Sequence, residues 1–177
     1  MKSHEIAIAT VLACAAAGSQ AQSAGPTDPQ IAEIVVTANQ VDIDAGKLAM
    51  SRSQSEDVKA FAQEMVKDHG AGNKSATALV HKLKVTPEAS DTNQSLKKGG
   101  ADNLAGLKKL NGAECNRAYI DHEVTYHEAV IDAIDKTLIP NANNVELKAL
   151  LEKSRPPFVD HLDHAKRLQT SMGKTGG

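Results

Sequence analysis

Helical periodicity is clearest in residues 58–69, which read VKAFAQEMVKDH. The apolar residues of this segment recur at the spacing of one helix face: Val58, Phe61, Ala62 and Met65. Because an α-helix turns about 100° per residue, His69 lies about 20° from Val58, level with this apolar stripe. The segment therefore predicts an amphipathic helix that carries one imidazole toward the core.

The same periodicity continues along most of the chain. It predicts long helices over four ranges: Asp28 to Arg52, Ser55 to Leu83, Ala113 to Leu138 and Asn144 to Leu168. Asp28 before Pro29 is a helix-start signal, with the aspartate as cap. A shorter helix is expected within residues 90–112, although its glycines lower its helix propensity. Pro156-Pro157 should kink or interrupt the last helix. The chain therefore predicts an all-α four-helix bundle over residues 30–170 with a shorter connecting helix, and a frayed tail over 171–177.

Composition limits the function further. The 177 residues are 41% hydrophobic, 24% charged and only 2% aromatic, with a net charge of -2. This length suits one domain with a real core. Few aromatic side chains and no positive excess disfavour nucleic acid as a partner. Two cysteines, Cys14 and Cys115, are too few for a disulfide scaffold or a zinc-finger cage.

The N-terminus predicts export. An apolar run from Ile6 to Ala17 follows Lys2, and the small residues Ser19-Gln20-Ala21 suit cleavage after Ala21. Residues 1–21 are thus expected to be a signal peptide and 22–29 a flexible linker, which places the protein in the periplasm or outside the cell. The alternative is a lipoprotein box, Val11 to Cys14, with Cys14 lipidated and the protein anchored to the envelope membrane. No later segment is apolar enough to span a membrane.

Five polar side chains fall on or near the inward face of the predicted helices: Asp42, His69, Glu123, His127 and His161. Glu123 and His161 also lie at almost the same number of residues from the predicted turn at Asn141. Burying a carboxylate is costly unless it is paired or binds a cation, and bundle interiors hold metal sites made from facing helices. We therefore treat the five as candidate ligands, for which zinc, copper or iron are suitable ions. The alternative is a buried polar network that fixes the alignment of the helices.

An enzyme is disfavoured, and no catalytic residue is assigned. Cys115 is the one candidate nucleophile after signal cleavage, near a predicted helix start where its thiolate character would rise. No supporting base accompanies it in the sequence.

Four segments carry a family resemblance: Val41 to Ala49, Val58 to His69 with Asn73, Arg117 to Ile120 leading to His127, and His161-Leu162 with Ala165 and Leu168. They resemble a bacterial family called domain of unknown function 4142, whose members look ferritin-like and exported. The resemblance spans about Asp28 to Leu168 and implies a ferritin-like bundle in the cell envelope. It implies no activity, because the family has none that is settled.

The chain departs from that family at several positions. Cys115-Asn116 stands where Phe-Asp is usual, and the first helix carries Asp42 and Asp44 where the family usually has Glu at one of them. The paired Glu-x-x-His motifs of di-iron bundles are absent, which disfavours a di-iron oxidase or an iron store. Two functions follow as hypotheses: metal binding in a stress or metal-handling role, or a non-enzymatic scaffold that binds a partner. Self-association into a homo-oligomer stays open.

Overall fold

The computed structural model describes residues 25–174. The predicted signal peptide, Cys14 and the first residues of the linker lie outside this range. The described residues form five long helices, a π-helical turn and a short helix: α1 (Asp28–Arg52), α2 (Glu56–Leu83), α3 (Asp91–Leu107), α4 (Gly112–Ala133), η1 (Ile134–Leu138), α5 (Ile139–Asn141) and α6 (Val145–Lys174). No strand occurs in residues 25–174, so the prediction of an all-α fold is confirmed. No helix in this range is long and apolar enough to span a membrane.

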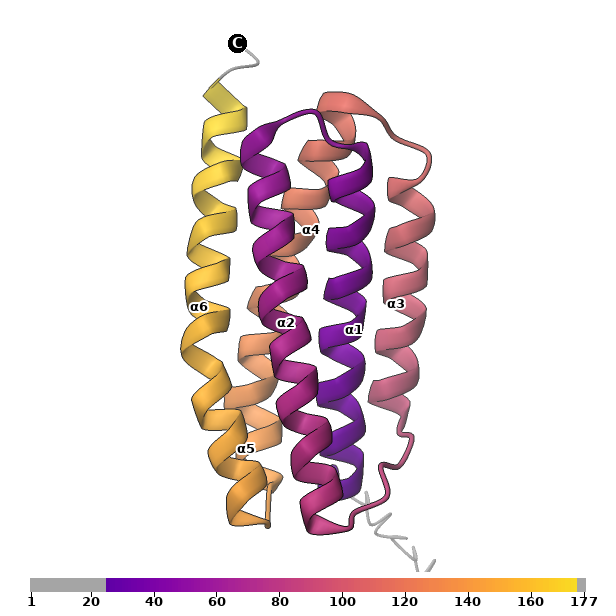
Figure 1. Cartoon of the computed structure of the whole chain (residues 1–177), viewed down its shortest axis with the longest axis vertical. Coiled ribbons are helices and arrows are strands. Elements are labelled where there is room, and N and C mark those ends of the chain that lie inside the picture. The colour runs from indigo at the N-terminus through magenta and orange to yellow at the C-terminus, as the bar shows by residue number, and fades with distance from the viewer. Residues whose placement is uncertain (1–24, 175–177) are drawn as a thin grey trace, which may run out of the picture.

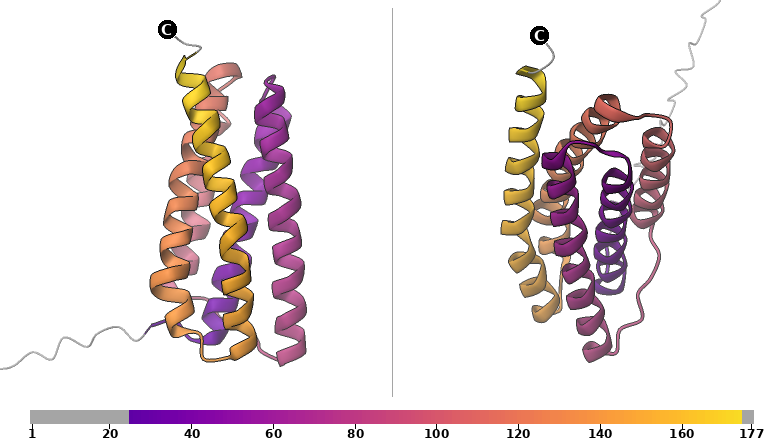
Figure 2. Two further views of the ribbon diagram at one scale, coloured as in Figure 1. Left: turned by 90° about the vertical axis from the view of Figure 1, so that its left-hand side faces the viewer. Right: turned by 45° about the horizontal axis from the view of Figure 1, so that its top comes forward.

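Four of the long helices form a bundle, and α3 packs on its outside. Figure 1 and Figure 2 show α1 and α6 running in one direction and α2 and α4 in the other, with α3 leading the chain back along α1. Within the bundle α1 contacts α2 and α4, while α6 contacts the same two helices from the other side. α3 is therefore the predicted shorter connecting helix, and it forms the crossover that places α4 beside α1 and α6.

Local signals define where the helices begin. Ser55 caps α2 by accepting a hydrogen bond from the Val58 N–H, and Ser90 caps α3 in the same way. The prediction that Asp28 caps α1 is wrong, because Thr27 is the N-cap residue. The Asp28 carboxylate instead accepts the N–H groups of two residues just before α6, each at 2.9 Å.

The last helix is longer than expected. It continues through Pro156 and Pro157, so of the two predicted outcomes an interruption is excluded, while a kink stays a prediction. Each proline removes the hydrogen bond to the carbonyl four residues earlier. Those carbonyls belong to the exposed residues Glu152 and Lys153, where the loss costs less than it would in the core. The helix also includes residues 171–174, which the sequence analysis assigned to the frayed tail.

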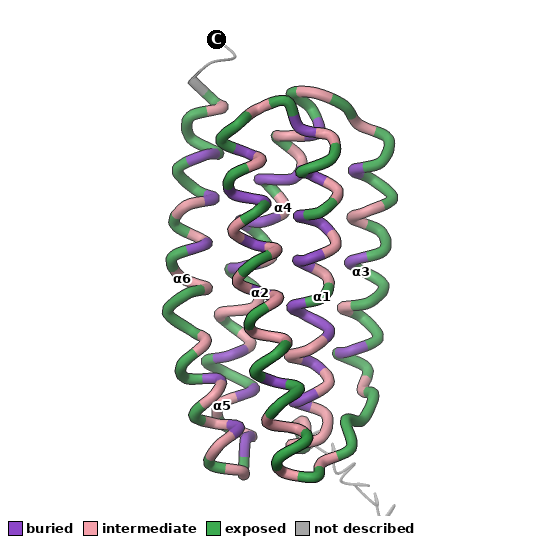
Figure 3. Tube along the Cα trace, in the orientation of Figure 1, coloured by how far each residue is buried: buried purple, intermediate pink, exposed green. Residues whose placement is uncertain are grey.

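The core has two apolar clusters separated by a polar layer. One cluster includes Phe61, Tyr119 and Ala165, and the other includes Ile31, Ile134 and Leu151. In chain order Asp42, His69, His127 and His161 lie between the two clusters on their helices, and Glu123 directly precedes Val124 of the first cluster. Figure 3 shows buried residues along the inner side of all the bundle helices.

Two adjacent glycines of α3 give a test of the packing between α3 and α1. A Cβ on Gly100 would lie 2.7 Å from Val41 Cγ2, whereas one on Gly99 would meet nothing within 4 Å. Gly99→Ala should therefore raise the free energy of unfolding by up to about 1 kcal/mol through helix propensity. Gly100→Ala should lower it by roughly 1–3 kcal/mol, because the stiff valine cannot move aside. Urea unfolding monitored by circular dichroism measures both, and equal effects would contradict this packing.

Candidate metal centre

All five candidate ligands lie in the interior. Their exposed fractions range from 0% for Glu123 and His127 to 4% for His161. Each bundle helix contributes at least one: Asp42 from α1, His69 from α2, Glu123 and His127 from α4, and His161 from α6. The interior position that helical periodicity predicted is thus observed, while metal ligation stays a prediction.

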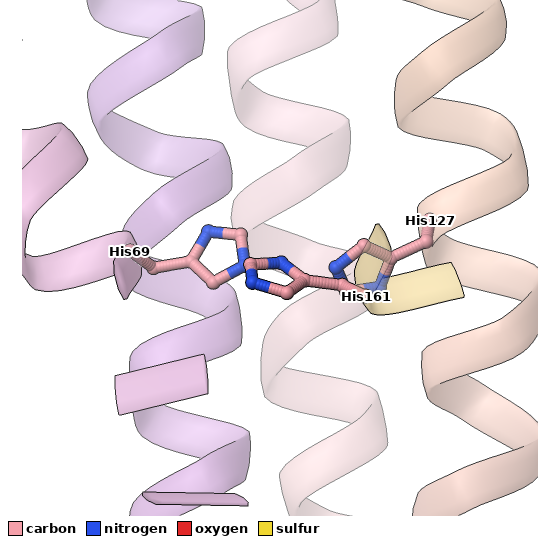
Figure 4. Close-up of side chains that lie close together, drawn as sticks. All are labelled: His69, His127 and His161. Carbon is pink, nitrogen blue, oxygen red and sulfur yellow. The ribbon is translucent and has the colours of Figure 1, made fainter. Parts of the chain in front are cut away.

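The three histidines form one cluster at the centre of the bundle (Figure 4). One ring nitrogen from each lies within 4.8 Å of one nitrogen from each of the others. The ring centroids are 5.3 Å apart for His69 and His161, 5.5 Å for His127 and His161, and 5.6 Å for His69 and His127. This spacing lets three nitrogens converge on one ion after small side-chain movements.

Each imidazole is oriented by an oxygen on its outer side. Nδ1 of His69 lies 2.9 Å from Asn39 Oδ1, and Nδ1 of His127 lies 2.9 Å from the Glu123 carbonyl oxygen. Nε2 of His161 lies 3.3 Å from Asp68 Oδ2. These oxygens accept hydrogen bonds, so they favour the tautomer in which the contacting nitrogen carries the proton, and in a neutral ring the other nitrogen then keeps the lone pair.

The other ring nitrogens face the interior. Nε2 of His127 and Nδ1 of His161 are buried with no hydrogen-bond partner among the described residues, whereas Nε2 of His69 lies 3.0 Å from Asp42 Oδ2. Buried polar atoms are nearly always hydrogen-bonded, so two unpaired nitrogens at one place require an explanation. An imidazole held by an oxygen on one nitrogen and free on the other is the usual arrangement of a metal-ligating histidine.

Two carboxyl groups adjoin the histidines. Asp42 Oδ2 lies 3.0 Å from His69 Nε2 and 3.7 Å from His127 Nε2. Glu123 Oε2 lies 3.5 Å from Nδ1 of His127, the nitrogen that faces away from the cluster. Asp42 therefore approaches Nε2 of two imidazoles, and one ligand atom each from Asp42, Glu123 and His127 lies within 4.8 Å of the other two.

The two acids differ in protonation. Burial opposes the charge of Asp42, but the attraction of His69 and its hydrogen bond to the carboxylate outweigh the burial and hold the pKa of Asp42 below its ordinary value. Burial and the charge of Asp42 raise the pKa of Glu123 well above its ordinary value. Burial lowers the pKa of His127 to about 4. At neutral pH Asp42 is therefore ionised and His127 neutral, and Glu123 is shifted toward its protonated form.

A cavity of about 740 Å³ extends from the cluster along the bundle, between α1, α2, α4 and α6. His69 and His161 line one end of it, and most of the other lining side chains are apolar. Phe158 also lines the cavity, and its ring centroid lies 5.0 Å from that of His69 and 5.7 Å from that of His127. Two histidines and an aromatic ring of the cluster thus border a mostly apolar cavity.

Sequence reasoning missed three residues of the site: Asn39, Asp68 and Phe158. Asn39 is 5% exposed, and its place on α1 gave no signal because it falls beside the apolar stripe rather than on it.

Cys115, the candidate nucleophile, is buried in the apolar cluster with its thiol 3.8 Å from the Leu107 carbonyl oxygen. Burial raises the pKa of this thiol, which disfavours the thiolate.

Replacement of Glu123 tests the assigned protonation states. Glu123→Gln should leave the unfolding free energy of the metal-free protein within about 1 kcal/mol of wild type near pH 5, because glutamine resembles the protonated acid. An acid with a raised folded-state pKa stabilises the protein below its ordinary pKa and loses this contribution as pH rises. The Glu123→Gln variant should therefore gain stability relative to wild type between pH 5 and 8.

Asp42→Asn, which removes an ionised group, should lower the free energy of unfolding by several kcal/mol over the same range. Identical pH profiles for wild type and Glu123→Gln would contradict the assignment.

Comparison with known proteins adds a family and no activity. No curated protein and no solved structure matches the chain. Residues 13–168 match the family described as Domain of unknown function (DUF4142), which covers nearly all of the sequence. The resemblance drawn from the motifs of the four bundle helices is thereby confirmed. The chain belongs to the DUF4142 family.

Proposed function

We propose that this protein binds one transition-metal ion in the centre of its bundle, with His69, His127, His161 and Asp42 as ligands. The observation that carries this proposal is the orientation of the three imidazoles. Each has an oxygen partner on its outer nitrogen, and the inner nitrogens of His127 and His161 have no hydrogen-bond partner, while that of His69 faces the Asp42 carboxylate. Glu123 adjoins Asp42 and His127 as a further acid of the site.

The ligand chemistry selects the class of ion. Three imidazole nitrogens and one carboxylate oxygen suit zinc, copper or iron, whereas calcium and magnesium prefer all-oxygen sites. Ligands must be deprotonated to bind a metal. The lowered pKa values of Asp42 and His127 therefore place these two groups in the form that binds at neutral pH.

The second candidate function is a scaffold whose buried polar groups only align the helices. Its support is the contact between His69 and Asp42 at 3.0 Å across α1 and α2, which a structural ion pair would also show. A network kept for structure alone is expected to satisfy its members, since an unpaired buried donor or acceptor costs about 1–3 kcal/mol. The inner nitrogens of His127 and His161 and the Glu123 carboxyl oxygens have no hydrogen-bond partner among the described residues, which favours the metal site over the scaffold.

Metal binding by the central cluster is tested with purified metal-free protein. Titration with Co²⁺ or Zn²⁺ should show one ion bound, and Co²⁺ should give the absorption of a four-coordinate site. His69→Gln and His127→Gln should each weaken binding by at least about 100-fold, because removing even an outer-shell partner costs 10–100-fold. His81→Gln is the matched control, since His81 is an exposed residue of the same helix as His69.

Thermal unfolding completes that experiment. Metal at 100 times its dissociation constant should stabilise wild type by about 2.7 kcal/mol, a rise of roughly 5–10 °C in Tm. The two histidine variants should lose this rise while circular dichroism shows that they remain helical. Wild-type protein that gains neither a bound ion nor thermal stability would overturn the metal proposal. If His69→Gln and His127→Gln lowered the stability of the fold but bound as much metal as wild type, the scaffold would be favoured.

The proposal includes export to the bacterial envelope, where the ion would be handled or kept from harmful reactions. Its support is the apolar run and the small residues before Gln22. Mass spectrometry of the protein isolated from the periplasm of a bacterial host should give a mature N-terminus at Gln22. An acylated N-terminus at Cys14 would instead indicate a lipid anchor, and an uncleaved cytoplasmic chain would contradict export.

A further inference from the structure

A second group of metal-binding side chains lies on the outer side of His161. Glu64 and Asp68 are one turn apart on α2, and His164 is one turn from His161 on the facing helix α6. Nδ1 of His164 lies 2.9 Å from Glu64 Oε2. One ligand atom each from Glu64, Asp68 and His161 falls within 4.8 Å of the other two. We call the four residues Glu64, Asp68, His161 and His164 the outer group.

The outer group reaches solvent, unlike the central cluster. The side chains of Glu64 and Asp68 are 42% and 38% exposed and that of His164 is 33% exposed, whereas that of His161 is 4% exposed. Two imidazoles thus face two carboxylates across the α2–α6 contact, which is a donor set for a transition metal rather than a purely acidic patch. An ion in solution can meet these ligands without any opening of the bundle.

His161 belongs to both groups and turns a different nitrogen to each. Nε2 faces Asp68 in the outer group, and the unpaired Nδ1 faces the central cluster. A neutral imidazole has one lone pair, so it ligates through one nitrogen at a time. Ligation of an outer ion through Nε2 and of a central ion through Nδ1 therefore exclude each other.

The central cluster needs a route by which a hydrated ion reaches it, because its residues are at most 4% exposed. Most side chains that line the cavity beside it are apolar and cannot replace the water shed by a cation, and the carboxylate that lines it, Asp68, belongs to the outer group. The outer group offers carboxylates at the surface and one ring shared with the centre. The polar path to the central cluster therefore runs through the outer group.

We propose that the outer group is an uptake site, which captures a divalent transition-metal ion from solvent and passes it through His161 to the central cluster. This inference rests on the proposed metal-binding function. During transfer the ion leaves Nε2 and binds Nδ1, and the proton lost from Nδ1 is matched by one gained at Nε2. The Nε2–H then donates to Asp68, the arrangement that the structure shows.

The rate of metal uptake tests this route separately from affinity. Metal-free protein is mixed with Co²⁺ in a stopped-flow instrument, and the absorption of the central site is followed with time. Glu64→Gln and His164→Gln should slow uptake on the order of tenfold, because they remove a carboxylate that attracts the cation and a ligand that holds it. Both should leave the equilibrium affinity of the centre within about threefold of wild type. Asp57→Asn is the matched control, since it removes one charge from an exposed position of the same helix.

Each other outcome overturns the inference. Unchanged uptake in both variants would remove the outer group from the route, and Ala133→Phe slowing uptake instead would assign the route to the cavity that Ala133 lines. An equal loss of rate and affinity would make Glu64 and His164 part of the central site or of its folding. Wild-type protein that binds no Co²⁺ would overturn the proposed function itself, whereas normal binding with unaltered rates would overturn only the uptake site.

Discussion

The ionised carboxylate of Asp42 lies 1% exposed in the middle of a helical bundle, and its charge constrains the residues around it. A buried charge is tolerated only with partners close by. Here the partners are His69 from α2 and His127 from α4, at 3.0 and 3.7 Å. Because these contacts join three helices, they also fix how far each helix is shifted along the bundle axis. The pKa values of the neighbouring acid and imidazole depend on the same charge.

This polar layer interrupts the apolar core. The clusters on either side of it are built from ordinary core residues. Replacing a buried ionic group by packed apolar side chains is often neutral or stabilising. A purely structural role therefore does not explain why these polar groups lie in the core. A bound cation would explain them, because it would pair with the carboxylate and the imidazole nitrogens together.

Much of this arrangement could be predicted from the sequence, because helical periodicity reports which face a residue occupies. It identified the interior positions of Asp42 and His69 and the crossover role of residues 90–112. It could not find Asn39 and Asp68, because a side chain at the margin of a stripe becomes important only through the imidazole it meets on another helix. The continuity of α6 through Pro156 was also missed, since the two lost hydrogen bonds fall on the solvent side. Helical periodicity shows which face of a helix a residue occupies, but it does not show which residue of another helix that side chain contacts.

The number and placement of the ligands bear on what a bound ion would do. Catalytic zinc sites keep one position open for water or substrate, whereas structural and transport sites are closed by protein ligands. Three imidazoles and Asp42 provide four donors, enough to complete a tetrahedral shell, and Phe158 packs against two of the rings on the cavity side. Glu123, the remaining acid, has a raised pKa and contacts Nδ1 of His127. Because these groups are at most 4% exposed, an ion bound among them would be shielded from bulk water, which fits holding a metal better than reacting with it.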